Sequence, residues 1–235
     1  NTKNNLPNKN PDKVDNIVLF DDAGTLMDTT SVKVHYARND GNYKNWGIWT
    51  WQHLPKDGDG KMLMFTESDG VYGNYATIDL VNDASYVGAT EIGFICKTHD
   101  PSTSPTTWTA GLTDISSDRF FKVPEQAPNG VYDIYLYEGV TDVMTSLDQA
   151  LKDKIVSSDF TNKSEISTSL ILSSSVSEIT EGMFHVYEDG VEVNLKAFNY
   201  ANKKVTVTLA KPADITKTYS IKVDFPSGAL TMSVG

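Results

Sequence analysis

Short runs of alternating apolar and polar residues, separated by turns rich in Asp, Gly, Asn and Pro, dominate the chain from about Ser31 onward. Successive side chains of a β-strand point to opposite faces, so an alternating run indicates a strand with one buried face. Many such runs with closely spaced turns are typical of antiparallel sandwiches. In the first half the runs cover Val32 to Tyr36, Lys61 to Phe65, Ala76 to Val81, Glu91 to Lys97, Arg119 to Val123 and Val131 to Tyr137. We therefore predict an all-β fold of antiparallel, immunoglobulin-like β-sandwich domains.

The period of the pattern changes around Thr145 to Ile155, where the apolar residues have helix-compatible spacing. A short linking helix and a domain boundary are expected there. Beyond it, strand patterns resume in Ile166 to Leu172, Met183 to Glu188, Val191 to Phe198, Lys203 to Leu209 and Thr218 to Phe225. Asp189-Gly190, between two of these runs, fits a two-residue type I′ hairpin, because Gly adopts positive φ without steric cost.

The opening stretch Asn1 to Asp15 is rich in Asn, Lys and Pro and lacks apolar periodicity, which is typical of a disordered lead or linker. Because the chain starts at Asn1 rather than Met, we expect a mature protein or an excised fragment. The predicted organisation is a lead over residues 1–28, a first sandwich over 29–140, a linker over 141–156 and a second sandwich over 157–235.

The composition limits the class of partner. The net charge is -11, from 31 acidic and 20 basic residues, whereas nucleic acids and anionic membranes need basic patches on the protein. No apolar run approaches the roughly 18 residues of a membrane-spanning helix. The single Cys96 excludes an internal disulfide and a cysteine-based zinc site, and we expect it to be buried as a small apolar residue. A neutral ligand is the best match.

Three of the four tryptophans, Trp46, Trp49 and Trp51, fall within six residues. In a strand, Trp49 and Trp51 share one face about 7 Å apart, and Trp46 faces the other way. An indole can stack on the apolar C–H face of a sugar ring, so two of them side by side could hold consecutive sugars. Their alternation with Thr50 and Gln52 also fits a half-buried strand whose tryptophans face the core. Periodicity alone favours this core alternative.

The tryptophan cluster belongs to a longer motif, which runs Val34-His35-Tyr36, Arg38, Asp40-Gly41-Asn42-Tyr43 and Trp46-Gly47-Ile48-Trp49-Thr50-Trp51. It continues through Val87-Gly88, Ile92 to Ile95 with Lys97, Trp108, Asp114, Asp118 to Phe120 and Val131 to Tyr137. Together these motifs resemble family-41 carbohydrate-binding modules, the α-glucan-binding domains at the N-termini of bacterial pullulanases. The second half resembles, more loosely, the immunoglobulin-like spacer that follows such modules, including Ile155 to Ser158 and Thr218 to Val223.

The resemblance implies that Trp49 and Trp51 stack on sugars together with a third aromatic from a later loop, here Trp108. It also implies a Lys–Asp pair that hydrogen-bonds sugar hydroxyls. The Asp of that pair matches Asp114, but Thr113 stands at the Lys position, which is a departure from the family pattern.

Alternatives remain for these residues when they are considered without the resemblance. Trp108 lies in the polar loop Ser104 to Gly111 and could be an exposed stacking residue or an anchor tucked against the core. Asp114 could equally be a turn-forming or capping carboxylate. Lys97 and Tyr43 could lie near the site, but such residues are more often solvated or structural.

Other chemistry finds little support in the residues. The stretch Lys56 to Lys61 resembles part of a calcium loop but lacks the distal bidentate Glu, and its Asp-Gly repeats fit ordinary turns. His35, His53, His99 and His185 lack metal-site spacing. A glycosidase-like carboxylate pair could be assembled in three dimensions, but the strand patterns leave no room for a β/α barrel. We expect no metal, no cofactor and no catalysis.

We predict a non-catalytic, monomeric protein that binds α-1,4/α-1,6-glucans such as starch, glycogen, pullulan and maltooligosaccharides through Trp49, Trp51, Trp108 and Asp114. It would be extracellular or on a bacterial cell surface, targeting an amylolytic enzyme or the cell to this substrate. The alternative from another class is a structural or adhesive surface protein in which Trp49, Trp51 and Trp108 are buried in the core. A free-standing glycosidase is a further alternative.

Overall fold

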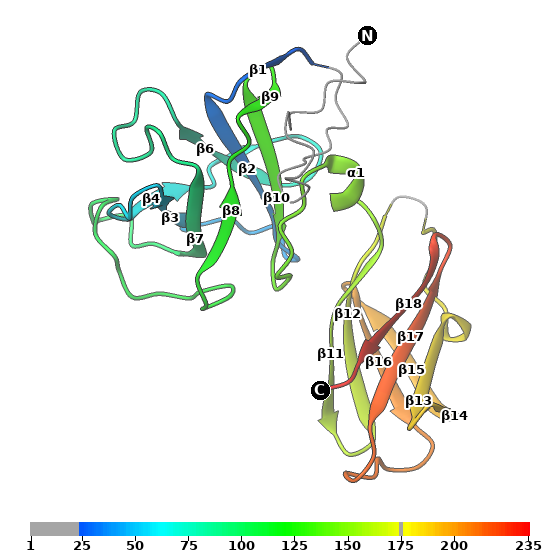
Figure 1. Cartoon of the computed structure of the whole chain (residues 1–235). Coiled ribbons are helices and arrows are strands. Elements are labelled where there is room, and N and C mark those ends of the chain that lie inside the picture. The colour runs from blue at the N-terminus through cyan, green and yellow to red at the C-terminus, as the bar shows by residue number, and fades with distance from the viewer. Residues whose placement is uncertain (1–23, 174–175) are drawn as a thin grey trace. The chain divides into compact units, whose positions relative to one another are not determined.

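The chain folds into two compact units that divide between Ala150 and Leu151 (Figure 1). A computed structural model describes residues 24–173 and 176–235. Strands dominate these residues, and the named helices are one turn each: α1 (Leu147–Ala150) and the 3-10 helix η2 (Glu181–Met183). The predicted all-β fold class is confirmed. No helix in the described part of the chain is long and apolar enough to cross a membrane.

Unit 1 contains two four-stranded sheets. The β2 sheet has the order β10 (Val131–Tyr137), β2 (Ser31–Ala37), β6 (Asn74–Asp79) and β5 (Glu67–Ser68). The β3 sheet has the order β4 (Lys61–Met64), β3 (Trp46–Leu54), β7 (Glu91–Thr98) and β8 (Arg119–Lys122). A separate antiparallel pair joins β1 (Leu26–Asp28) to β9 (Gln126–Pro128).

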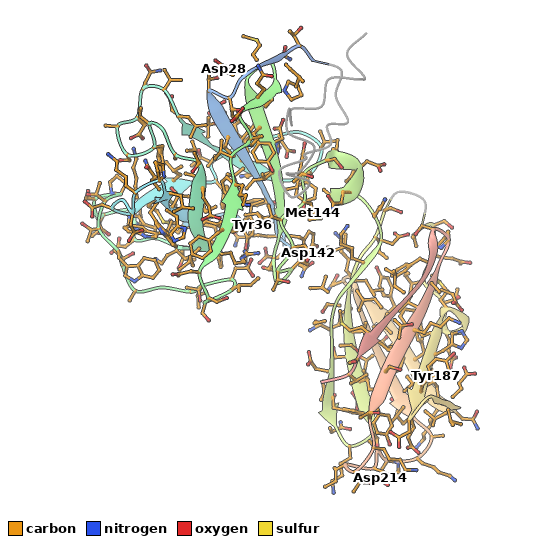
Figure 2. All side chains as sticks on the ribbon, in the orientation of Figure 1. Asp28, Tyr36, Asp142, Met144, Tyr187 and Asp214 are labelled. Atoms are coloured by element: carbon orange, nitrogen blue, oxygen red, sulfur yellow. The ribbon has the colours of Figure 1, made fainter. Side chains whose placement is uncertain are left out.

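The core of unit 1 is built from alternate residues of both sheets. Val34 of β2, Ile134 of β10, and Ile48 and Phe94 of the β3 sheet are fully buried in one apolar cluster, and their side chains are among those drawn in Figure 2. Cys96 of β7 belongs to the same cluster and is buried, as predicted. The two sheets thus bury their facing surfaces and leave the opposite faces available for other contacts.

One strand pair departs from the antiparallel pairing predicted for the sandwiches. β10 runs parallel to β2, with Val131 opposite Ser31 and Tyr137 opposite Ala37. A parallel pair needs a long connection between its strands, and the chain passes through all the other strands of both sheets in unit 1 before it returns to β2. The alternation within each strand predicts that it is a strand but does not fix its partner.

The boundaries in the structure differ from the predicted ones at two places. Residues 1–23 of the predicted lead lie outside the described residues, but β1 begins at Leu26, within the range assigned to that lead. β11 begins at Lys154, within the predicted linker 141–156. The preceding Asp153 accepts hydrogen bonds from Ser173 N and Ser227 Oγ, which tie the start of the second unit to its later segments. The division between Ala150 and Leu151 lies within Thr145 to Ile155, where the period change predicts a domain boundary.

Unit 2 is a second pair of four-stranded sheets. One has the order β11 (Lys154–Asn162), β12 (Glu165–Ile171), β16 (Lys204–Leu209) and β15 (Leu195–Ala201). The other has the order β14 (Val191–Val193), β13 (Phe184–Glu188), β17 (Tyr219–Phe225) and β18 (Gly228–Ser233). Asp189 and Gly190 join β13 to β14 with φ of 46° and 82°, which confirms the predicted hairpin turn with positive φ at both positions.

Candidate functional site

The two faces of β3 have different surroundings. Ile48, Thr50 and Gln52 are buried on the side of the sandwich core, and Trp46 also belongs to the core cluster. Trp49 and Trp51 alternate with them, are only partly buried and lie outside the core cluster. The alternative in which these tryptophans face the core is therefore wrong, because β3 turns them to the outer face of its sheet.

Two glycines make room for these indoles on the outer face. Gly93 lies opposite Trp51 in the register of β3 and β7, and a Cβ at Gly93 would be 2.3 Å from Trp51 Cε2. A Cβ at Gly60 would be 2.2 Å from Trp49 Cε2. Glycine in a strand commonly marks such a close approach, so each indole rests on a backbone position where a side chain would displace it.

The loop from residue 99 to residue 112, here called the 99–112 loop, brings the third predicted tryptophan to the same face. The Trp108 ring lies 5.3 Å from that of Trp49, centre to centre, at an interplanar angle of 87°. This edge-to-face arrangement is a favourable geometry for aromatic pairs. Because Trp108 is 47% exposed, it is not a core anchor.

Hydrogen bonds at three places hold the 99–112 loop against the β3 sheet. Met62 N in β4 donates to Pro105 O at 2.7 Å. Thr98 and Leu112 exchange two bonds, from Thr98 N to Leu112 O and from Leu112 N to Thr98 Oγ1, both at 2.9 Å. Lys97 Nζ donates to Thr109 O at 2.7 Å, beside Trp108. Trp108 is thus positioned by ordered backbone on either side of it.

Lys97 is one of the residues that hold the loop, and the sequence alone did not decide whether it lies at the site or is structural. It is 1% exposed, and its ammonium also donates to Thr98 O at 2.6 Å. The ammonium lies 4.6 Å from the centre of the Trp108 ring, within the range of a cation–π contact. Burial lowers the pKa of Lys97. Lys97 therefore has a structural role, as the buried cation under the loop.

Replacing Lys97 by Met is expected to lower the free energy of unfolding of unit 1 by about 1–3 kcal/mol, because the carbonyls of Thr98 in β7 and Thr109 in the loop lose their charged donor. The variant Lys97→Arg, which keeps donors and charge, should lose less. Denaturant unfolding followed by tryptophan fluorescence measures this, since all four tryptophans lie in unit 1. Equal stability of Lys97→Met and the wild type would contradict the anchoring role.

Phe120 and His53 extend the same surface, although sequence reasoning did not select them. The Phe120 ring lies 6.0 Å from the Trp51 ring at 85°, and 4.4 Å from the His53 ring. Phe120 is 41% exposed, whereas the adjacent Phe121 is buried. Adjacent residues of a strand point to opposite faces, so of Phe120 and Phe121 only one can lie in the core. The sequence therefore contained a signal that the other ring lies on the outer face. We call Trp49, Trp51, Trp108 and Phe120 the aromatic face.

Asp114 does not join this group. Its Oδ1 accepts a hydrogen bond from Gly139 N at 2.7 Å, and its Oδ2 accepts one from the hydroxyl of Tyr36 at 3.2 Å. Tyr36, labelled in Figure 2, is fully buried, and burial raises the pKa of Asp114. Thr113, one residue earlier, is exposed and bridges to Lys97. The sugar contact predicted for Asp114 is therefore not supported by these bonds, because both carboxylate oxygens are engaged by Gly139 and Tyr36.

The second unit contains an open hollow of about 420 Å³, lined by Glu181, Phe184, His185, Glu192, Val193, Asn194 and Leu195. The two ring nitrogens of His185 lie 2.6 Å from Glu192 Oε1 and 2.9 Å from Asp224 Oδ2. The hydrogen bond with Glu192, and then that with Asp224, raises the pKa of His185.

Over residues 24–173 and 176–235, no group of three or more His, Cys, Asp and Glu side chains is placed to hold a metal ion.

Comparison with known proteins bears on the unit that carries the aromatic face. Residues 30–145 match the model of the family described as "Bacterial pullanase-associated domain". This segment is thus similar to that family, and the resemblance predicted for the first half of the chain is confirmed.

Two solved structures are similar to the chain. One is described as "Alpha-glucan recognition by family 41 carbohydrate-binding modules from streptococcal virulence factors"; it is 18% identical, with 51% of this chain and 49% of that chain covered and a TM-score of 0.33. The other is described as "Product complex of a multi-modular glycogen-degrading pneumococcal virulence factor SpuA"; it is 13% identical, with 87% of this chain and 27% of that chain covered and a TM-score of 0.35. The chain thus spans about half of the first structure and about a quarter of the second.

Proposed function

We propose that unit 1 binds α-glucan chains by stacking their sugar rings on Trp49, Trp51 and Trp108. The observation that carries this proposal is the gathering of three partly exposed indoles on the outer face of one sheet, outside the core. Such a group leaves apolar area in water without contributing to the core, which is typical of a binding surface. The match of residues 30–145 to a pullulanase-associated family supports carbohydrate as the ligand class.

The arrangement of the rings favours a bent polysaccharide over a flat one. Trp108 stands at 87° to Trp49, so the two rings do not form one planar strip. A flat β-linked chain needs coplanar stacking faces, whereas an α-1,4-linked chain curves and presents successive sugar faces at an angle. The net charge of -11 is also compatible with a neutral ligand.

The proposed role is binding without chemistry. In this role unit 1 holds an attached amylolytic enzyme, or the bacterial surface that carries it, on starch, glycogen or pullulan outside the cell. Tethering raises the local concentration of the attached partner on the polysaccharide without any new contact between them. Unit 2 would act as a sandwich spacer.

Calorimetric titration of maltotetraose into the chain tests this function. We expect a dissociation constant on the order of micromolar, because desolvation and ordering of the sugar chain oppose the stacking gain. Maltotetraose should also protect tryptophan fluorescence from quenching by acrylamide. Cellotetraose at the same concentration should produce neither binding heat nor protection. Absence of heat and of protection with maltotetraose would refute glucan binding and favour a structural or adhesive spacer protein.

A further inference from the structure

Phe120 is an aromatic side chain that the fold of β8 does not require at the surface. In this strand Phe121 packs into the core, while the Arg119 guanidinium lies over the ring of the core residue Phe94 at 4.7 Å from its centre. Phe120 points the other way and is 41% exposed. A large apolar ring left in water contributes little to folding, so its position calls for another explanation.

The contacts of Phe120 make it continuous with the tryptophans. In the register of the β3 sheet, Trp51 lies opposite Gly93, and Gly93 lies opposite Phe120. Because Gly93 has no side chain, nothing separates the two rings, and they meet edge to face at 6.0 Å. The aromatic face therefore runs from Trp108 of the 99–112 loop and Trp49 of β3 through Trp51 of β3, across Gly93 of β7, to Phe120 of β8.

His53 provides a polar group at this end of the face. The register of β3 and β7 shifts between Gln52 and Leu54, which indicates an irregularity at His53, and such bulges commonly redirect a side chain. The His53 ring lies 4.4 Å from that of Phe120, and its Nδ1 lies 2.6 Å from Glu91 Oε2. A carboxylate only accepts hydrogen bonds, so Nδ1 carries the hydrogen toward Glu91. The other ring nitrogen, Nε2, is then left to form a hydrogen bond with a hydroxyl, which can both donate and accept.

We propose that Phe120 and His53 form a further sugar-binding position, which continues the α-glucan site beyond Trp51. Phe120 stacks on one additional sugar ring, and His53 Nε2 forms a hydrogen bond with one of its hydroxyls. This inference rests on the proposed function of the aromatic face. It predicts that the chain distinguishes glucans by length, because short oligosaccharides occupy the tryptophans alone.

Titration calorimetry with maltotriose and maltoheptaose tests the additional position. Phe120→Ala should weaken maltoheptaose binding about 3- to 10-fold, the value of one aromatic contact, and leave maltotriose binding within about twofold. Phe120→Leu keeps an apolar side chain but removes the ring, and it should behave like Phe120→Ala. His53→Phe keeps the ring contact and removes the hydrogen-bonding nitrogen, so it should weaken maltoheptaose binding by less than Phe120→Ala does. Tyr200→Ala, a change at a 36%-exposed aromatic of unit 2, is the matched control and should change neither.

The outcomes separate this inference from the function on which it rests. Equal weakening of both sugars by Phe120→Ala in a folded variant would show that Phe120 only supports Trp51, and it would overturn the additional position. Unchanged binding of both sugars would overturn it as well. If the wild-type chain binds neither sugar, the proposed function itself fails. Melting temperature and tryptophan emission verify that each variant is folded.

Discussion

Replacing both Trp49 and Trp51 by alanine is expected to lower the affinity for maltotetraose at least about 100-fold, while unit 1 remains folded. Tryptophan is enriched among the hot-spot residues of binding sites, whose truncation costs about 2 kcal/mol or more, and every 1.4 kcal/mol corresponds to a factor of about ten in the dissociation constant. This is the largest effect on binding that we expect from any change at the surface of the chain.

The fold should survive this change because the two indoles are not part of the core. Trp46 and Ile48 pack the inner face of β3 against the core in the wild type and in the variant. The truncation removes contacts with Gly60 and Gly93 and the edge contact with Trp108, all on the outer face. The expected loss of unfolding free energy is about 1–2 kcal/mol for each of the two substitutions, in the usual range for single substitutions.

Titration calorimetry, with circular dichroism to monitor folding, measures both quantities. The double variant Trp49→Phe and Trp51→Phe is the matched control, since it keeps two smaller aromatic rings at the same positions and should lose less affinity than the alanine variant. Unchanged maltotetraose binding in the folded alanine variant would move the binding site elsewhere. The aromatic face would then have to be explained as a contact surface for another protein.

Much of the fold follows from local patterns in the sequence. Alternation predicted the strands, and Asp189-Gly190 predicted a turn with positive φ, because only a few residue types tolerate that conformation. The parallel pairing of β10 with β2 did not follow, since the partner of a strand is set by contacts distant in sequence. The division between the two units, by contrast, lies within Thr145 to Ile155, where the period of the pattern changes.

The position of the candidate site could be predicted where the spacing of the tryptophans was combined with the resemblance. Periodicity showed that Trp49 and Trp51 share a face but favoured the core, whereas the resemblance favoured the surface on which they lie. Asp114 was selected by alignment, and no local pattern reveals that its carboxylate accepts bonds from Gly139 and Tyr36. The position of Lys97 under the 99–112 loop likewise depends on how that loop folds back.

Replacing Gly93 by alanine is expected to weaken maltotetraose binding about 10-fold, with a loss of unfolding free energy of about 1 kcal/mol. The added Cβ would be 2.3 Å from Cε2 and 2.4 Å from Cζ2 of Trp51, so the indole has to move. Because this indole lies on the outer face, it can swing toward solvent, and the strain stays at the lower end of the range for overpacked sites. The change therefore acts on the position of the ring more than on folding.

Gly182→Ala is the matched control, because a Cβ at Gly182 meets nothing within 4 Å. It should bind maltotetraose like the wild type. The decisive comparison is a double-mutant cycle: if Gly93→Ala acts by displacing Trp51, it should have no further effect on affinity in a Trp51→Ala background. An equal loss in both backgrounds would mean that Gly93 acts on binding through the backbone of β7. If instead the effect of Gly93→Ala depends on Trp51, the lack of a side chain at Gly93 in β7 determines how the indole of Trp51 in β3 is positioned for binding.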